Sequence, residues 1–152
     1  MGQQQLLLLV LGITVVGVAM IISIQVYSNN QKKHNSDALV STSTRIASDA
    51  QTWLQTSSVF GGGAPTSGVR PLDFTSQPLT IELLGYPVDG SGEYKDVHGK
   101  YSGGVNGAKF IIKASSATTS GAGDNNFVCT IVTGMTAEDI QSIVNPSPGS
   151  CS

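Results

Sequence analysis

The N-terminal part of the chain is an almost unbroken run of hydrophobic positions. Of the 21 residues from Leu6 to Val26, 16 are apolar, and no charged side chain occurs before Lys32. An α-helix of this length would be about 31 Å long, which matches the hydrocarbon core of a bilayer. The pattern therefore predicts a helical segment at about residues 6–26 that needs lipid or other apolar helices around it.

Helical spacing of apolar positions continues beyond this segment. Between residues 37 and 54 the apolar side chains recur at helical intervals and polar ones fill the remaining positions; they are Leu39, Ile46, Ala50, Trp53 and Leu54. No proline precedes Pro65, and no glycine lies between Gly17 and Gly61. The sequence therefore predicts one helix from about Gly2 to Ser57, with residues 1–58 as a helical part and residues 59–152 as a β-rich head.

Short strand patterns separated by glycine-rich turns follow the break at Gly61-Gly62-Gly63. The expected strands are residues 79–84, 109–113 and 127–132, with a weaker one at 94–101. A short helix is expected from Thr136 to Val144. The predicted class is α+β: a long helix on a roughly four-stranded antiparallel sheet, with Trp53, Leu54 and Phe60 packed between them.

The two cysteines, Cys129 and Cys151, lie near the C-terminus. A disulfide between them would stabilise the head by roughly 3 kcal/mol. A redox pair normally has the spacing Cys-x-x-Cys, and a zinc site needs four ligands. A structural disulfide closing a C-terminal loop is therefore favoured over both alternatives.

Composition and charge disfavour several classes of function. The chain carries 8 basic and 10 acidic side chains, a net charge of −2, so nucleic-acid binding is not evident. Glu93, Asp96 and His98 lie within six residues, but interleaved lysines favour a solvated loop over a metal or acid–base site. Phosphate-binding, nucleophile-elbow and zinc-protease motifs do not occur. We expect no enzymatic activity, no metal and no cofactor.

The charges around the apolar run conflict with a simple anchor. Lys32 and Lys33 follow it, which would place the rest of the chain in the cytoplasm, whereas two cysteines suit an oxidising space. Nothing basic precedes Leu6, as a signal peptide would require. We expect that a basic leader was removed before Met1, with Gln3 as the alternative mature N-terminus.

This order of elements resembles the type IV pilins: an apolar N-terminal segment, its amphipathic continuation, a glycine-rich loop, an antiparallel sheet and a cysteine pair near the end. The resemblance implies a subunit stored in the inner membrane and cut by a prepilin peptidase. It further implies that the pilus assembly machinery packs the subunits, helix to helix, into an extracellular filament of identical copies. Methylation of the terminal amine and a role in adhesion belong to the same expectation.

Two positions depart from the family pattern. The family usually carries Glu at mature position five, where this chain has Gln5. We expect the amide of Gln5 to accept a hydrogen bond from the terminal amine of Met1 of a neighbour. The family's proline near position 22 is replaced by Ile22, so loosening of the helix in a filament would centre on Gly12 and Gly17. A continuous helix whose glycines permit close packing is the alternative.

The leading hypothesis is a structural subunit of a type IV pilus-like filament on the cell surface. The first alternative is a pseudopilin of a type II secretion-like system, which the cysteine loop disfavours. The second is a monomeric, membrane-anchored extracellular binding domain. That domain would not require the apolar run to continue into an amphipathic helix.

Overall fold

The computed structural model describes residues 2–64, 73–75, 78–117, 126–146 and 151. Its elements, in chain order, are α1 (Gly2–Gln55), η1 (Ser58–Phe60), η2 (Glu82–Leu84), β1 (Tyr94–Lys95), β2 (Gly99–Asn106), β3 (Lys109–Ser116), β4 (Phe127–Val132), η3 (Ala137–Asp139) and β5 (Ile140–Val144). The contacts divide the chain into two compact units, Met1–His34 and Asn35–Ser152. The second unit, called the folded unit below, thus includes the last part of α1, whereas the sequence prediction drew the boundary at residue 58.

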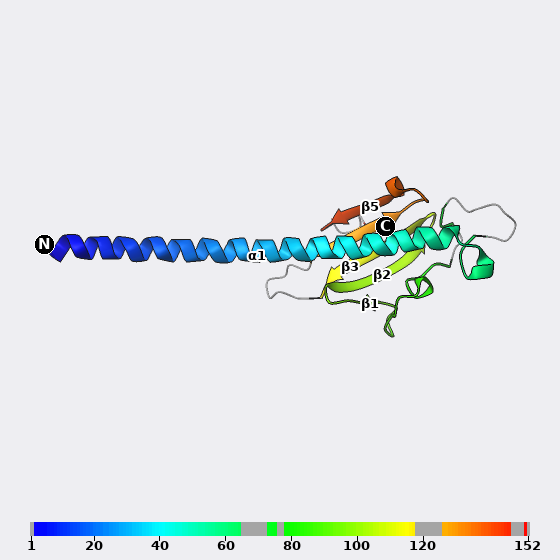
Figure 1. Cartoon of the computed structure of the whole chain (residues 1–152), viewed down its shortest axis with the longest axis horizontal. Helices are drawn as coiled ribbons and strands as arrows, with labels where there is room; N and C mark the ends of the chain where they lie inside the picture. Colours follow the sequence, from blue (N-terminus) through cyan, green and yellow to red (C-terminus); the bar gives the residue numbers. More distant parts are fainter. Residues whose placement is uncertain (1, 65–72, 76–77, 118–125, 147–150, 152) are drawn as a thin grey trace. The chain divides into compact units, whose positions relative to one another are not determined.

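The strands form one antiparallel sheet in the order β1-β2-β3-β4-β5, so each strand pairs with its neighbours in sequence. Within the folded unit, α1 crosses one face of this sheet (Figure 1). The predicted α+β class, with a long helix on an antiparallel sheet, is confirmed. The sheet has five strands instead of about four: the weak pattern at 94–101 contributes to both β1 and β2, with Tyr94 opposite Tyr101, residues 140–144 add β5, and residues 79–84 form no strand.

The core lies between α1 and the sheet. One stripe of α1 is buried, and each of its members has another three or four residues away: Leu39, Ser43, Ile46, Ala47, Ala50, Gln51 and Leu54. Alternate residues of the strands meet this stripe, among them Tyr101, Phe110, Ile112, Ala114, Val128 and Val132. The amphipathic pattern predicted for residues 37–54 therefore marks the face of α1 that the sheet covers.

Polar contacts fix the register between α1 and the sheet. Gln51 donates two hydrogen bonds of 2.8 Å from its amide nitrogen, to the carbonyl oxygens of Gly134 and Thr136. The buried hydroxyl of Thr130 donates to the hydroxyl of Ser43 at 3.0 Å. Because buried polar groups are costly without partners, these bonds disfavour any other placement of this part of α1 on the sheet.

Two predicted elements are wrong. Residues 79–84 are not a strand: Thr80 makes an isolated bridge to Gly104, and residues 82–84 form η2. Leu79 and Ile81 do alternate into the core, but Gly85 has φ 87° and its N–H bonds back to Glu82, which turns the chain.

The predicted helix from Thr136 to Val144 is replaced by η3 and the edge strand β5. Thr136 does begin a helical turn, because the Asp139 carboxylate accepts from its N–H at 2.9 Å. The turn stops at Asp139. The following Ile-Gln-Ser-Ile-Val segment is rich in β-branched residues and pairs with β4, where Val132 faces Ile140 and Val128 faces Val144. Pairing with an available sheet edge thus overrides a weak helical pattern.

The end of α1 requires glycine. Helix α1 ends at Gln55, and the chain returns so that the N–H of Gly63 bonds to the Trp53 carbonyl at 2.9 Å and that of Ala64 to the Thr56 carbonyl at 2.9 Å. A Cβ at Gly62 would overlap the backbone carbonyl of Thr56. The return therefore depends on the missing side chain.

We predict that Gly62→Ala destabilises the folded unit by about 1–3 kcal/mol, since the overlapping atom belongs to backbone that cannot swing aside. The matched control is Gly90→Ala, where a Cβ would meet nothing within 4 Å. Urea unfolding of the full chain in detergent, followed by circular dichroism, measures both. Equal stability of the two variants would contradict this account of the helix end.

Candidate functional site

The first part of α1 presents an apolar surface on every side. Residues Gly2 to Gln31 are all exposed within the chain, and Leu6, Ile24 and Tyr27 keep 67%, 69% and 66% of their surface accessible. Within the described residues, α1 is the helix long and apolar enough to cross a membrane. The segment is therefore compatible with membrane anchoring, and in water it would carry a large hydrophobic penalty.

Hydroxyl groups inside the apolar segment are satisfied by the helix itself. Thr14 Oγ1 donates to the Leu11 carbonyl at 2.8 Å, and Ser23 Oγ donates to the Ala19 carbonyl at 2.8 Å. Since an unpaired hydroxyl is expensive in an apolar environment, these bonds lower the cost of surrounding the segment with lipid or protein.

The structure places the predicted assembly residues on a regular helix. Gly12 and Gly17 lie in uninterrupted α1, and a Cβ at either would meet nothing within 4 Å. The helix is thus continuous there in the single chain, and loosening in a filament stays a prediction. Gln5 is exposed on the first turns of α1. Met1 lies outside the described residues, so its contact with Gln5 also stays a prediction.

Of the residues predicted to join helix and sheet, two contact the core and one does not. Leu54 is fully buried in the core and Trp53 packs against it, partly buried. The predicted packing of Phe60 between helix and sheet is wrong. Phe60 lies in η1, and its side chain is 84% exposed. The turn at Ser57–Gly61 directs it outward, because η1 is capped by the Ser57 side chain and ends at a left-handed Gly61.

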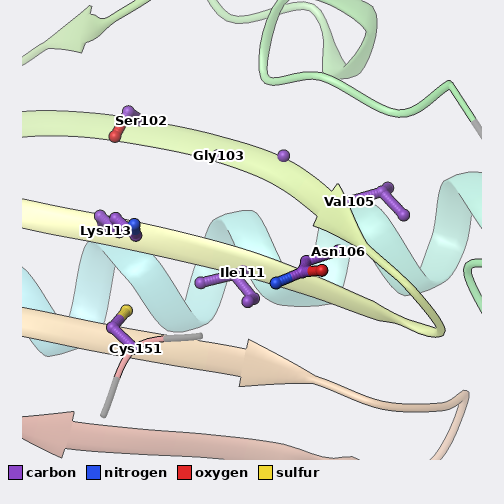
Figure 2. A pocket seen from close by; sticks show the side chains of 8 residues that line it. Ser102, Gly103, Val105, Asn106, Ile111, Lys113 and Cys151 are labelled. Atoms are coloured by element: carbon purple, nitrogen blue, oxygen red, sulfur yellow. The ribbon is translucent and has the colours of Figure 1, made fainter. Parts of the chain in front are cut away.

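The predicted disulfide is present. Cys129 and Cys151 are bonded, with their Cα atoms 5.8 Å apart. Cys129 is fully buried in β4, and its alternation with Val128 and Thr130 puts it on the sheet face away from α1. The bond therefore holds Cys151 against that face, as Figure 2 shows.

An open groove of about 370 Å³ lies beside Cys151 on this face (Figure 2). Strands β2 and β3 and the bonded cysteine line it, through Ser102, Gly103, Gly104, Val105, Asn106, Ile111, Lys113 and Cys151. Lys113 is the one titratable side chain in this lining. The groove thus offers an ammonium group, a hydroxyl and an amide, which suit binding by hydrogen bonds and charge.

The acidic loop around Glu93, Asp96 and His98 is organised by a residue that the prediction did not emphasise. Asp89 Oδ1 accepts from the N–H groups of Ser91 and Glu93 at 2.9 and 3.2 Å, and Asp89 Oδ2 lies 2.5 Å from Lys95 Nζ. The Lys95 ammonium, followed by the two N–H groups, lowers the Asp89 pKa to about 2. An Asp-Gly-Ser-Gly turn with a lysine six positions after its Asp was the available sequence signal.

The described part of the chain contains no cluster of metal-ligating side chains. No group of three or more His, Cys, Asp or Glu side chains could hold an ion there. The backbone carbonyl of His98 instead accepts from the N–H of Ala117 at 3.2 Å and from the Asn35 amide at 3.4 Å. The described geometry is that of a structured turn region.

Comparisons with protein-family models, with curated proteins and with solved structures found no match to this chain.

We predict that Lys95→Gln raises the Asp89 pKa from about 2 toward its ordinary range near 4, because the ammonium that favours the carboxylate is gone. A folded-state pKa below the unfolded value means that this carboxylate stabilises the fold above about pH 4 and that the contribution is lost as pH falls through about 2. Carbon-detected NMR titration of the Asp89 side chain measures the pKa. Lys100→Gln removes the same charge from β2 and should leave it unchanged; an unshifted pKa in Lys95→Gln would contradict the assignment.

Proposed function

We propose that this chain is the structural subunit of an extracellular filament of the type IV pilus kind, polymerised through packing of the apolar segment, residues 6–26. The observation that carries the proposal is that every residue of an uncharged, apolar helical segment is exposed, in a chain that also has a disulfide-closed folded unit. Such a surface requires cover from outside the chain.

Other copies of the same helix fit this requirement. Gly12 and Gly17 lack side chains on the apolar segment, so a neighbouring helix can approach closely there. Lipid would supply the same cover before assembly, which agrees with an inner-membrane subunit that is later extracted into a filament. The Cys129–Cys151 bond suits the oxidising space outside the cell.

The alternatives use the same helix differently. A pseudopilin would assemble briefly in the periplasm, and a monomeric anchored domain would keep the segment in lipid. The closed C-terminal cysteine loop favours the pilus subunit over the pseudopilin. Continuity of α1 from Gly2 into the core of the folded unit favours a polymer subunit over an independent domain on a plain anchor.

We predict thin filaments in the supernatant of sheared producing cells, with this chain as their subunit. Electron microscopy of the pelleted material shows the filaments. Intact-mass spectrometry of the dissolved subunit should give a chain lighter by the two hydrogens of the Cys129–Cys151 bond and should reveal methylation of the terminal amine. Chain confined to the membrane fraction, with no filament containing it, would overturn the proposal.

A matched pair of variants sharpens this test. Ile13→Asp places a carboxylate on the apolar segment and should reduce filament yield at least about tenfold, because the charge must be desolvated on packing. Ile13→Val keeps the surface apolar and should assemble normally. Quantifying the subunit in the membrane fraction separates an assembly defect from failed insertion.

A further inference from the structure

The strand register places Lys100, Lys109 and Lys113 on one face of the sheet, together with Lys95 of β1, which lies opposite Lys100 and is paired with Asp89. Lys100 of β2 lies opposite Ser115, while Lys113 and Lys109 of β3 lie opposite Ser102 and Asn106. Their neighbours Tyr101, Phe110 and Ala114 are fully buried toward α1. Because successive side chains alternate between faces, all three lysines lie on the face away from α1.

These lysines form a row. Lys109 and Lys113 are four residues apart on one strand, which corresponds to about 13 Å, and Lys113 is diagonal to Lys100 at about 7 Å. All three are exposed. We call them, together with Ser102 and Asn106, the basic face.

No acidic side chain in the strands neutralises the charge of Lys100, Lys109 and Lys113. The five strands contain four lysines and no Asp or Glu. In the part of the chain that the structure describes, the fourth, Lys95, is paired with Asp89, and no ion pair engages the other three. The basic face is therefore locally positive although the chain has a net charge of −2.

The groove beside Cys151 adds neutral hydrogen-bonding groups to this charge. The Ser102 hydroxyl, the Asn106 amide and the Lys113 ammonium line it, with Ile111 as an apolar floor (Figure 2). Hydroxyl, amide and ammonium groups match the hydroxyls and carboxylates of an acidic sugar. No aromatic side chain lines the groove, so it lacks the stacking platform that single-stranded nucleic acids use.

We propose that the basic face binds a carboxylated polysaccharide that lies along strands β2 and β3. Exposed lysine–carboxylate pairs are weak singly and screened by salt, so one copy would bind poorly. The inference rests on the proposed filament function, because a polymer of identical subunits repeats the face many times and converts weak contacts into avidity.

The test measures binding of sheared filaments to immobilised polygalacturonate, with uncharged dextran as the reference surface. In about 0.1 M salt, Lys100→Gln/Lys109→Gln/Lys113→Gln should lower the bound fraction at least about tenfold. The single variant Lys113→Gln should weaken binding several-fold. The matched variant Lys33→Gln removes the same charge from α1, outside the sheet, and should change binding less than about twofold.

Several results would overturn the inference. Wild-type filaments that do not bind polygalacturonate, or that bind it equally well without the three lysines, would do so. Equal or tighter binding to double-stranded DNA would show an unselective attraction for polyanions. Loss of filaments in the triple variant would make the face a contact between subunits.

Failure of the proposed function is distinguishable from failure of this inference. Electron microscopy shows whether wild-type filaments exist before any binding is measured. If they do not, the full chain reconstituted at high density in phosphatidylcholine vesicles presents the same face many times. If those vesicles bind polygalacturonate and the triple variant does not, polysaccharide binding by the basic face is supported although the filament is not. If the vesicles do not bind, both proposals are overturned.

Discussion

The organisation of this molecule depends on one requirement: the apolar segment of α1 needs cover that the described part of the chain does not give it. Every residue of that segment is exposed, and no charge interrupts it. Burial of apolar area contributes about 25 cal/mol per Å² of favourable free energy. The free energy of burying the apolar segment therefore favours surroundings of lipid or other apolar helices over water. The self-satisfied hydroxyls of Thr14 and Ser23 remove the polar penalties that would oppose burial in lipid or among other helices.

The folded unit holds the last part of α1 within its own core. A narrow stripe from Leu39 to Leu54 enters the core, and Gln51 pins this stretch through two carbonyls. The disulfide closes the C-terminal end against the opposite face of the sheet. The described carboxylates all lie outside the strands, whereas four lysines lie on them, so the sheet carries positive charge in a chain whose net charge is −2.

Sequence periodicity was sufficient where burial is one-sided and continuous. It located α1 and strands β3 and β4, since the stripe at residues 39–54 and the apolar runs at 109–113 and 127–132 are set by local pattern. The cysteine bond followed instead from the number and spacing of the cysteines. It was wrong where contacts with other segments or the local backbone determine the conformation. Ile140–Val144 forms a strand because it pairs with the edge of β4. Phe60 points outward because of the backbone conformation at Ser57–Gly61. The basic face was invisible because only the pairing of β2 with β3 brings Lys100 beside Lys113.

Cross-linking tests most directly whether copies of this chain cover one another's apolar segments. A photoreactive amino acid at Val16, which is 53% exposed in the single chain, should join subunits of purified filaments, with the cross-link mapping to residues 6–26 of another copy. The same group at Val97, 85% exposed on the folded unit, should give no product with that segment. Cross-links from Val16 to lipid alone, or to a different protein, would contradict the account.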